Sequence, residues 1–357
     1  MADRSHHERS RRSISSSYLL ISQKKGDNIM NRKLACLLLV IFWMMLLGVA
    51  NGVFGKETTF PNKPIELVCP WGPGGSTSMG GRIIAGTLSE LIGTPVVLNY
   101  KTAGGGVAGA VYVARAKPDG YTLLINNSSI NGIFLAIRSV DYKNSDFEPL
   151  ALYGMQPLGL AVRNDAPWKT LQELMADAKK NPGKLKFGTS GFGTASHFGV
   201  ELLKMTAGGL KMDVMPLKSG AECVASVLGG HIHMTLLYMV DLKGAYDAGK
   251  LRILATAEEK RIEEYPNVPT FAELGYPGVQ ITAWYGIAAP AGVPKEISDK
   301  LKDTLYRTIK TPDVNKMLTK IGYIPVFKDS AEFGKFISSE EKKFLKIAKE
   351  ANIKLEE

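Results

Sequence analysis

The sequence predicts an α/β protein made of two lobes, each built around a mostly parallel sheet. Short apolar runs with strand-like composition alternate with longer segments that carry apolar residues at helical spacing. Strands that alternate with helices are typical of α/β folds. The apolar pattern breaks near Pro157 and returns near Ile281, so we expect one lobe at 56–156 plus 281–357 and the other at 157–280.

The first 55 residues are not expected to belong to this fold. They contain a short basic stretch, then LACLLLVIFWMMLLGVA, then small residues, which is the order typical of a secretory signal peptide. We therefore expect 30–55 to be a signal peptide cleaved after Ala50 or Gly55, and 1–29 to be a non-native upstream extension. An uncleaved membrane anchor is the alternative, because the apolar stretch is near the lower limit for a membrane span.

The charge distribution argues against nucleic-acid binding. The whole chain has a formal net charge of +10, and residues 1–55 carry eight basic and three acidic residues of the 44 and 34 in total. The expected mature chain therefore has 36 basic and 31 acidic residues, a net charge of +5. These charges are scattered and not clustered with aromatic residues, so we expect a mildly basic protein suited to small anionic ligands.

Cysteine and histidine do not indicate a metal site. Cys36 lies in the predicted signal peptide, while Cys69 and Cys223 stand far apart in the sequence. The latter two could form a disulfide in an oxidising compartment, although two buried free thiols are the favoured interpretation. His231 and His233 share a strand face, but no carboxylate or third ligand stands at metal-binding spacing.

Four glycine-rich and hydroxyl-rich loops follow predicted strands and are poor in acidic residues. Exposed N–H groups at a helix N-terminus bind anions, and ligands in α/β sheets gather at the carboxyl ends of strands. Any single loop of this kind is typical of a turn or a helix cap. Four of them together predict an anion-binding cleft. The loops are WGPGGSTSMGG (71–81), KTAGGGVAG (101–109), NNSSING (126–132) and GTSGFGTASH (188–197).

The sequence contains parts of two nucleotide-binding motifs, but each motif lacks a required residue. Residues 104–109 satisfy G-x-G-x-x-G, yet the dinucleotide fold needs an acidic residue about 20 positions later, where this chain has Asn126 and Asn127. The phosphate-binding loop needs a lysine after its last glycine, and here Arg82 follows Gly81. Neither a dinucleotide nor a nucleotide phosphate is therefore predicted.

A catalytic nucleophile is also not indicated. The G-x-S-x-G pattern of hydrolases is missed at 188–192, because the last position is Phe192. His197 could act as a general base in a secreted hydrolase, which is one alternative function. Helix capping or packing is the favoured role for this histidine.

The chain resembles a known family, the extracytoplasmic solute receptors of tripartite tricarboxylate transporters, also called Bug proteins. The resemblance runs from about Phe60 to the C-terminus. Its most specific part is LRILATAEEKRIEEYPNVPTFAELGYPG followed by WYGIAAPAGVPKEI, and PNKPIELVCPWGPGGSTSMGGRIIA and AKPDGYTLL are similar to two further signatures.

The resemblance implies a type II periplasmic binding protein-like fold, with two α/β lobes that close on a ligand cleft. It implies a periplasmic receptor without cofactor or catalysis, which binds a small carboxylate (a dicarboxylate, tricarboxylate or aromatic acid). The receptor would deliver this ligand to membrane permease subunits. A periplasmic sensor that feeds a signalling partner is the alternative, because it would have the same cleft.

The family pattern also implies a set of ligand-binding positions. They are Trp71, Pro73, Gly74, Gly75, Ser76, Thr77, Ser78, Gly105, Gly106, Ser128, Thr189, Gly193, Thr194, His197, Lys218 and Asp241.

Some of these positions depart from the pattern or have a second interpretation. Ser78 stands where the family usually has Asp, which favours a plain acid over an amino acid as ligand. Trp71 is bulkier than usual and could stack on a flat ligand or wall the cleft. Lys218 could equally be a solvated surface amine, and Asp241 could equally be a helix cap.

Overall fold

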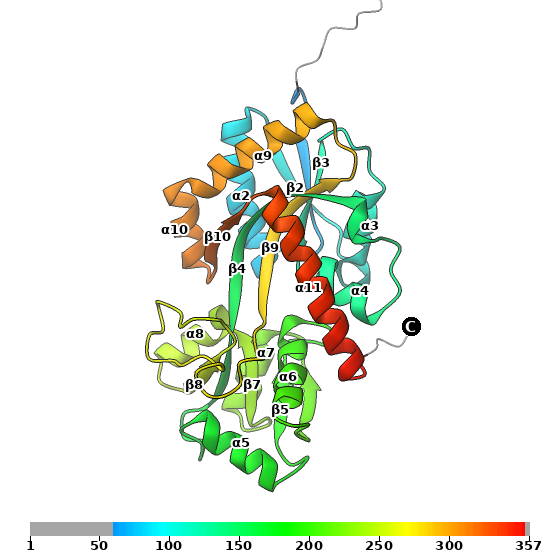
Figure 1. The fold of residues 1–357 in the computed structure, drawn as a ribbon. Helices are drawn as coiled ribbons and strands as arrows, with labels where there is room; N and C mark the ends of the chain where they lie inside the picture. Colours follow the sequence, from blue (N-terminus) through cyan, green and yellow to red (C-terminus); the bar gives the residue numbers. More distant parts are fainter. Residues whose placement is uncertain (1–59, 354–357) are drawn as a thin grey trace, which may run out of the picture. The chain divides into compact units, whose positions relative to one another are not determined.

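The computed structural model describes residues 60–353, in which strands and helices alternate (Figure 1). The predicted upstream extension and signal peptide lie outside these described residues. Within 60–353, no helix combines the length and the apolar character needed to cross a membrane.

Ten strands in the described part of the chain form two sheets that share one strand. The first sheet has the order β2-β1-β3-β9-β4-β10, and the second has the order β8-β4-β7-β5-β6. The strands are β1 (Ile65–Cys69), β2 (Val96–Tyr100), β3 (Thr122–Asn127), β4 (Phe147–Arg163), β5 (Lys186–Thr189), β6 (Asp213–Pro216), β7 (Met234–Tyr238), β8 (Leu251–Thr256), β9 (Thr282–Pro290) and β10 (Ile324–Lys328).

Helices cover both faces of the first sheet. An added Cβ at Gly81 of α2 would meet Ile125, whereas one at Gly286 would meet Phe333 of α11. Ile125 and the partner of Gly286 are successive residues of β3, so α2 and α11 lie on opposite faces. The α-helices are α2 (Ser76–Ile92), α3 (Val107–Ala114), α4 (Phe134–Ile137), α5 (Leu171–Lys180), α6 (Ala195–Thr206), α7 (Gly220–Leu228), α8 (Met239–Asp247), α9 (Lys295–Lys310), α10 (Pro312–Lys320) and α11 (Ser330–Glu350).

Strand β4 joins the two sheets without interruption. Residues 147–157 pair with β9, and residues 158–162 pair with β7. The apolar pattern of the sequence breaks near Pro157, yet the backbone runs through this point as a single strand. The break in the apolar pattern marks the point where β4 exchanges one partner strand for another.

The prediction of mostly parallel sheets is wrong, because the described strands make four parallel and five antiparallel pairings. All five antiparallel pairings involve β4, which belongs to both sheets, or β9, which lies beside β4 in the first sheet. The parallel strands end at the crossover, so a strand that enters a sheet from the crossover is antiparallel to them. The parallel core of each sheet follows the sequence prediction, and the crossover strands do not.

Helix α2 begins at Ser76, so it takes up the second half of the glycine-rich loop predicted at 71–81. Gly80 and Gly81 lie in its first turns, and glycine disfavours helix in isolation. Close packing explains both residues, since an added Cβ at Gly80 would lie 2.8 Å from the Tyr323 hydroxyl.

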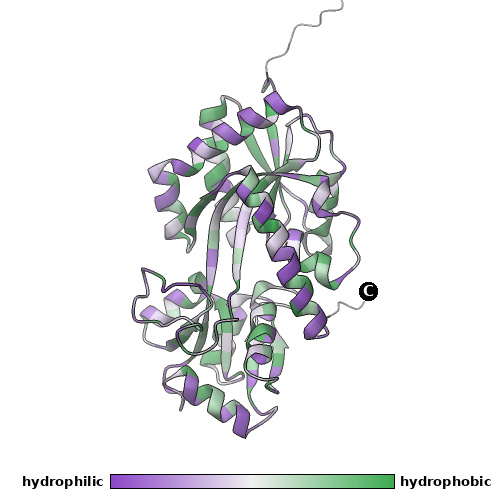
Figure 2. Ribbon diagram, viewed as in Figure 1, coloured by the Kyte–Doolittle hydropathy of each residue, from purple (hydrophilic) through white to green (hydrophobic). Residues whose placement is uncertain are grey.

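The apolar strands form the core, and the helices expose their polar faces, as Figure 2 shows. Cys69 and Cys223 are buried and free, so the interpretation as two thiols is confirmed.

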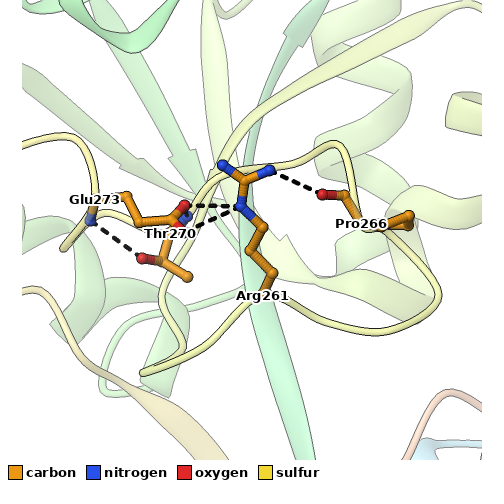
Figure 3. Close-up of polar contacts among 4 residues, drawn as sticks. All are labelled: Arg261, Pro266, Thr270 and Glu273. Atoms are coloured by element: carbon orange, nitrogen blue, oxygen red, sulfur yellow. Dashed lines mark hydrogen bonds and ion pairs between the residues drawn. The ribbon is translucent and has the colours of Figure 1, made fainter.

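The return segment between β8 and β9 is held by polar contacts (Figure 3). Arg261 Nε donates to Glu273 Oε2 at 2.9 Å, and its Nη1 donates to the Pro266 carbonyl at 2.9 Å. Thr270 and Glu273 each accept from the other's backbone N–H, at 3.2 and 3.0 Å. These contacts order a segment that has few backbone hydrogen bonds of regular structure.

We expect Gly286→Ala to lower the free energy of unfolding by about 2–3 kcal/mol, because overpacking strains a dense core. The Cβ of the new alanine would lie 2.7 Å from the Ala151 carbonyl oxygen, a backbone atom that cannot easily move away. Gly86→Ala is the control, since nothing lies within 4 Å of its Cβ in α2. That change should stabilise by roughly 0.5–1 kcal/mol. Urea unfolding measures both, and equal effects would contradict the packing argument.

Candidate functional site

The strand register makes loops from the two sheets face each other. Asn127, the last residue of β3, pairs with Tyr285 near the start of β9. Tyr238, the last residue of β7, pairs with Leu158, which follows the crossover in β4. The carboxyl ends of the parallel strands in both sheets therefore lie at the crossover. The loops that follow β1, β3, β5 and β7 therefore leave their strands at this end of each sheet; Figure 1 labels the strands.

The loop after β1 ends in a helix N-terminus that no side chain caps. Gly75 is the N-cap of α2 in extended conformation, and the first turn of α2 has no acidic residue. Pro73 and Gly74 are exposed, and Gly74 has a φ of +90°, which favours glycine. The first N–H groups of α2 thus form an electropositive end suited to an anion.

Two of the three hydroxyl residues of this first turn contact tyrosine hydroxyls on different strands. Ser78 is fully buried, and its Oγ lies 3.0 Å from the Tyr100 hydroxyl on β2. Ser76 Oγ lies 3.5 Å from the Tyr285 hydroxyl on β9, and Thr77 is buried. Ser78 therefore contacts a strand of its own sheet.

The second glycine turn lies directly against the first loop. Gly104, Gly105 and Gly106 all have positive φ, of 63°, 67° and 101°. An added Cβ at Gly106 would lie 3.3 Å from the Trp71 ring, so only glycine allows this close approach. Trp71 is half-buried and forms a wall between the two turns.

Arg138 is a residue near these turns that sequence reasoning missed. Its Nη2 donates to the Gly104 carbonyl at 3.1 Å, and its guanidinium lies 3.9 Å from the centre of the Phe134 ring. This places a positive charge beside the second glycine turn. A basic residue after the third predicted loop was the available signal, but only the fold brings it to this turn.

Ser128 closes the third strand and is buried. Its N–H donates to the Trp284 carbonyl at 3.3 Å, and the preceding Asn127 Oδ1 accepts from the N–H groups of Ser129 and Ile130. The asparagine thus shapes the turn.

In the second sheet, the loop after β5 is ordered by its own side chains. Thr194 caps α6, accepting from His197 N–H at 3.3 Å and donating to the Gly191 carbonyl at 2.9 Å. His197 Nδ1 accepts from the Gly193 N–H at 3.3 Å. Burial lowers the pKa of His197, so its imidazole is neutral and carries its proton on Nε2. Thr189 is fully buried, and its Oγ1 has no partner in the described residues.

Asp241 and Lys218 occupy different environments. Asp241 lies in the first turn of α8, and its carboxylate packs against Gly220, the first residue of α7. Burial raises its pKa to about 6. Lys218 is exposed, and its backbone N–H donates to Glu222 Oε2 at 2.8 Å.

A tyrosine cluster under the first turn of α2 was not foreseen from the sequence. The Tyr285 hydroxyl donates to Gln156 Oε1 at 3.0 Å, and the Tyr323 hydroxyl donates to the Ser76 carbonyl at 3.0 Å. The Tyr153 and Tyr323 rings stack at 6.0 Å between centroids. Burial raises the pKa of all these phenols, so they remain neutral hydrogen-bonding groups. The cluster ties the α2 N-terminus to the crossover.

Residues 60–353 hold no group of three or more His, Cys, Asp or Glu side chains arranged for a metal ion. The site is thus one of uncapped N–H groups, hydroxyls and glycine turns, and this chemistry suits binding.

Comparison with known proteins identifies the family. The profile of the tripartite tricarboxylate transporter family receptors (TctC) matches residues 81–353. The chain belongs to this receptor family. The protein BugT of Bordetella pertussis is 31% identical over 312 residues, which cover 86% of this chain and 94% of BugT.

Two solved structures share the fold and were determined with ligands. The R. palustris protein Rpa4515 with adipate is 30% identical, covering 83% of this chain and 99% of its own, with a TM-score of 0.73. MatC of Rhodopseudomonas palustris with bound malate is 26% identical, covering 81% and 99%, with a TM-score of 0.69. The predicted family and periplasmic binding fold are confirmed, and the family and these neighbours are solute-binding proteins, not enzymes.

We expect Asp241→Asn to raise the free energy of unfolding at about pH 7.5 by about 1–2 kcal/mol, measured without ligand. The carboxyl titrates near 3.8 when unfolded and near 6 when folded, so its ionised form is disfavoured in the fold. This penalty is absent below the unfolded pKa, grows as the pH rises, and is complete above the folded pKa. The gain should therefore vanish near about pH 3.5. Urea unfolding at both pH values measures it, with exposed Asp213→Asn as control. A gain equal at both pH values would contradict the assignment.

Proposed function

We propose that this protein is an extracytoplasmic solute-binding receptor that captures a small carboxylate and delivers it to the membrane permease subunits of a tripartite tricarboxylate-type transporter. The observation that supports it most is the register at the crossover. It brings an uncapped helix N-terminus and glycine turns of one sheet opposite the capped loop of the other.

In the proposed binding mode, one carboxylate of the ligand accepts from the N–H groups of the Gly75–Ser78 turn at the start of α2. Trp71 and the Gly105–Gly106 turn border the position proposed for this carboxylate. The first turns of α2 and α6 contain no acidic residue, so neither opposes an anion. Arg138 adds a positive charge beside the second turn.

The second sheet would complete the site when the lobes close. We propose lobes at 56–156 plus 281–357 and at 157–280, with β4 and β9 as the connecting strands. Closure would bring Thr189 and the Thr194 loop onto the ligand, directly or through water. Ligand favours the closed state only through contacts that it makes better there than in the open state.

The ligand class follows from the available groups and from the relatives. The structures of Rpa4515 and MatC were solved with adipate and malate, which are both dicarboxylates. Ser78 provides no carboxylate to pair with an amino group, so a plain dicarboxylate is proposed over an amino acid. The signal peptide expected at 30–55 would place the protein in the periplasm, as its relatives' family implies.

A ligand screen tests the proposed function. Purified protein is heated with adipate, malate, citrate, phthalate and glutamate, and the melting temperature is compared with that of protein refolded after removal of any retained ligand. A ligand that binds only the folded state raises the melting temperature by mass action. A shift with a plain di- or tricarboxylate supports the proposal, and no shift with any acid contradicts it.

We expect Gly75→Leu to weaken carboxylate binding at least about a hundredfold, because its side chain would fill the position proposed for the anion. The change is sterically clean, since the atom nearest to its Cβ lies 3.9 Å away and its φ is −76°. Gly244→Leu is the matched control, as it is exposed on α8 with nothing within 4 Å. Calorimetric titration measures both variants, and unchanged affinity in Gly75→Leu would show that the ligand binds elsewhere.

A further inference from the structure

A polar pocket lies within the first sheet's own layers. It has a volume of about 300 Å³ and lies between the end of β3, the start of β4 and helix α11. Its floor includes Asn126 and Asn131, while Ser145 and Ser338 line it at the surface, where both are exposed. The pocket is therefore open to solvent at one end and closed at the other.

Asn126 is a residue of this pocket whose side-chain amide lacks hydrogen-bond partners. Its side chain is fully buried, and neither its amide oxygen nor its amide nitrogen has a hydrogen-bond partner in the described residues. A buried amide without partners costs free energy on the order of 1–3 kcal/mol for each unmade bond. Native proteins rarely leave such groups unsatisfied, so the pocket is expected to be filled by a hydrogen-bonding molecule.

Asn131 adds a fixed acceptor beside Asn126. Its Nδ2 donates to Asn144 Oδ1 at 2.5 Å, and Asn144 Nδ2 in turn donates to Glu341 Oε2 at 2.7 Å. This chain of contacts orients Asn131, whose own Oδ1 is buried and has no partner among the described residues. The lining of the pocket thus offers one donor group and two acceptor oxygens that are buried and have no partner among the described residues.

The walls of the pocket are apolar, because Phe147, Pro149 and Ile337 line it. Water alone suits this shape poorly. Water would satisfy the amides at the closed end, but the apolar walls would stay in contact with water. A molecule with one polar end and an apolar body would satisfy both the floor and the walls.

The chemistry of the floor selects a neutral ligand. No lysine, arginine or carboxylate side chain lines the pocket, so nothing there would balance a charged group. An amide floor pairs best with a group that has a donor and an acceptor side by side. A carboxamide has this arrangement, with its oxygen for Asn126 Nδ2 and its N–H for the Asn126 or Asn131 oxygen.

We propose that the Asn126 pocket beneath α11 is a second binding site, which takes a small neutral molecule with a carboxamide end and an apolar body. This site is separate from the proposed carboxylate site, although both lie at the end of β3. Asn126 faces the α11 side of the sheet, and the next residue, Asn127, begins the turn to Ser128.

A pair of probes of nearly equal shape tests this inference. Benzamide has the carboxamide, and acetophenone replaces its NH₂ by a methyl group, which removes the donor. Both are neutral, so neither competes for an anion site. Ligand-observed NMR titration of the purified protein should show benzamide binding at least about tenfold more tightly than acetophenone.

Three variants locate the binding. Asn126→Leu removes the amide at similar volume and should weaken benzamide binding at least about tenfold. Asn126 is buried, so its replacement acts on the core as well as on the pocket. Ser338→Trp therefore provides a second test from the exposed surface of α11, where the new ring would block the opening of the pocket. Ser339→Trp is the matched control, since Ser339 is also exposed on α11 but does not line the pocket.

The proposal requires benzamide binding that falls at least about tenfold in Ser338→Trp and changes less than about twofold in Ser339→Trp. Three results would overturn it. They are no benzamide binding to the wild-type protein, equal binding of benzamide and acetophenone, and binding that survives in Ser338→Trp. The first result would mean that the pocket takes no carboxamide, and the other two would mean that benzamide binding does not depend on the Asn126 pocket.

Discussion

The antiparallel register of β4 is the constraint on which the rest of this structure depends. The strand leaves β9 at Pro157 and pairs with β7 from Leu158 onward, with no intervening turn. A one-residue shift in this pairing would turn every side chain of the strand to the opposite face. Because β4 belongs to both sheets, its register fixes how the loops of one sheet lie against those of the other.

The tyrosine cluster connects β4 to the loop at the start of α2, so the register of β4 also positions that loop. Tyr285 reaches from β9 to both Gln156 on β4 and Ser76 at the start of α2. Gly80 and Gly81 allow α2 to approach the sheet closely enough for these contacts. The helix that presents its N–H groups to an anion is therefore anchored on neutral phenols, which leave its electropositive end uncompensated.

Local sequence predicted the parts of the fold that depend on neighbouring residues. Alternating apolar patterns gave the α/β class, and glycine and hydroxyl residues gave the four loops. The long-range parts were not predictable, because β4 reads as two strands until its partners are known, and the short β10 has a half-buried pattern without alternation. In the site, Trp71 and Gly106 were named separately, but their contact was not. Arg138 and the tyrosines were missed because only tertiary packing brings them to the loops.

The surroundings of His197 explain why this histidine has a structural role and not a catalytic one. His197 accepts a backbone N–H through Nδ1 and is neutral through burial, so it orders the loop that Thr194 caps. Among the named site residues, Asp241 is the only carboxylate, and burial already disfavours its ionised form. An anion that binds near it would disfavour that form further.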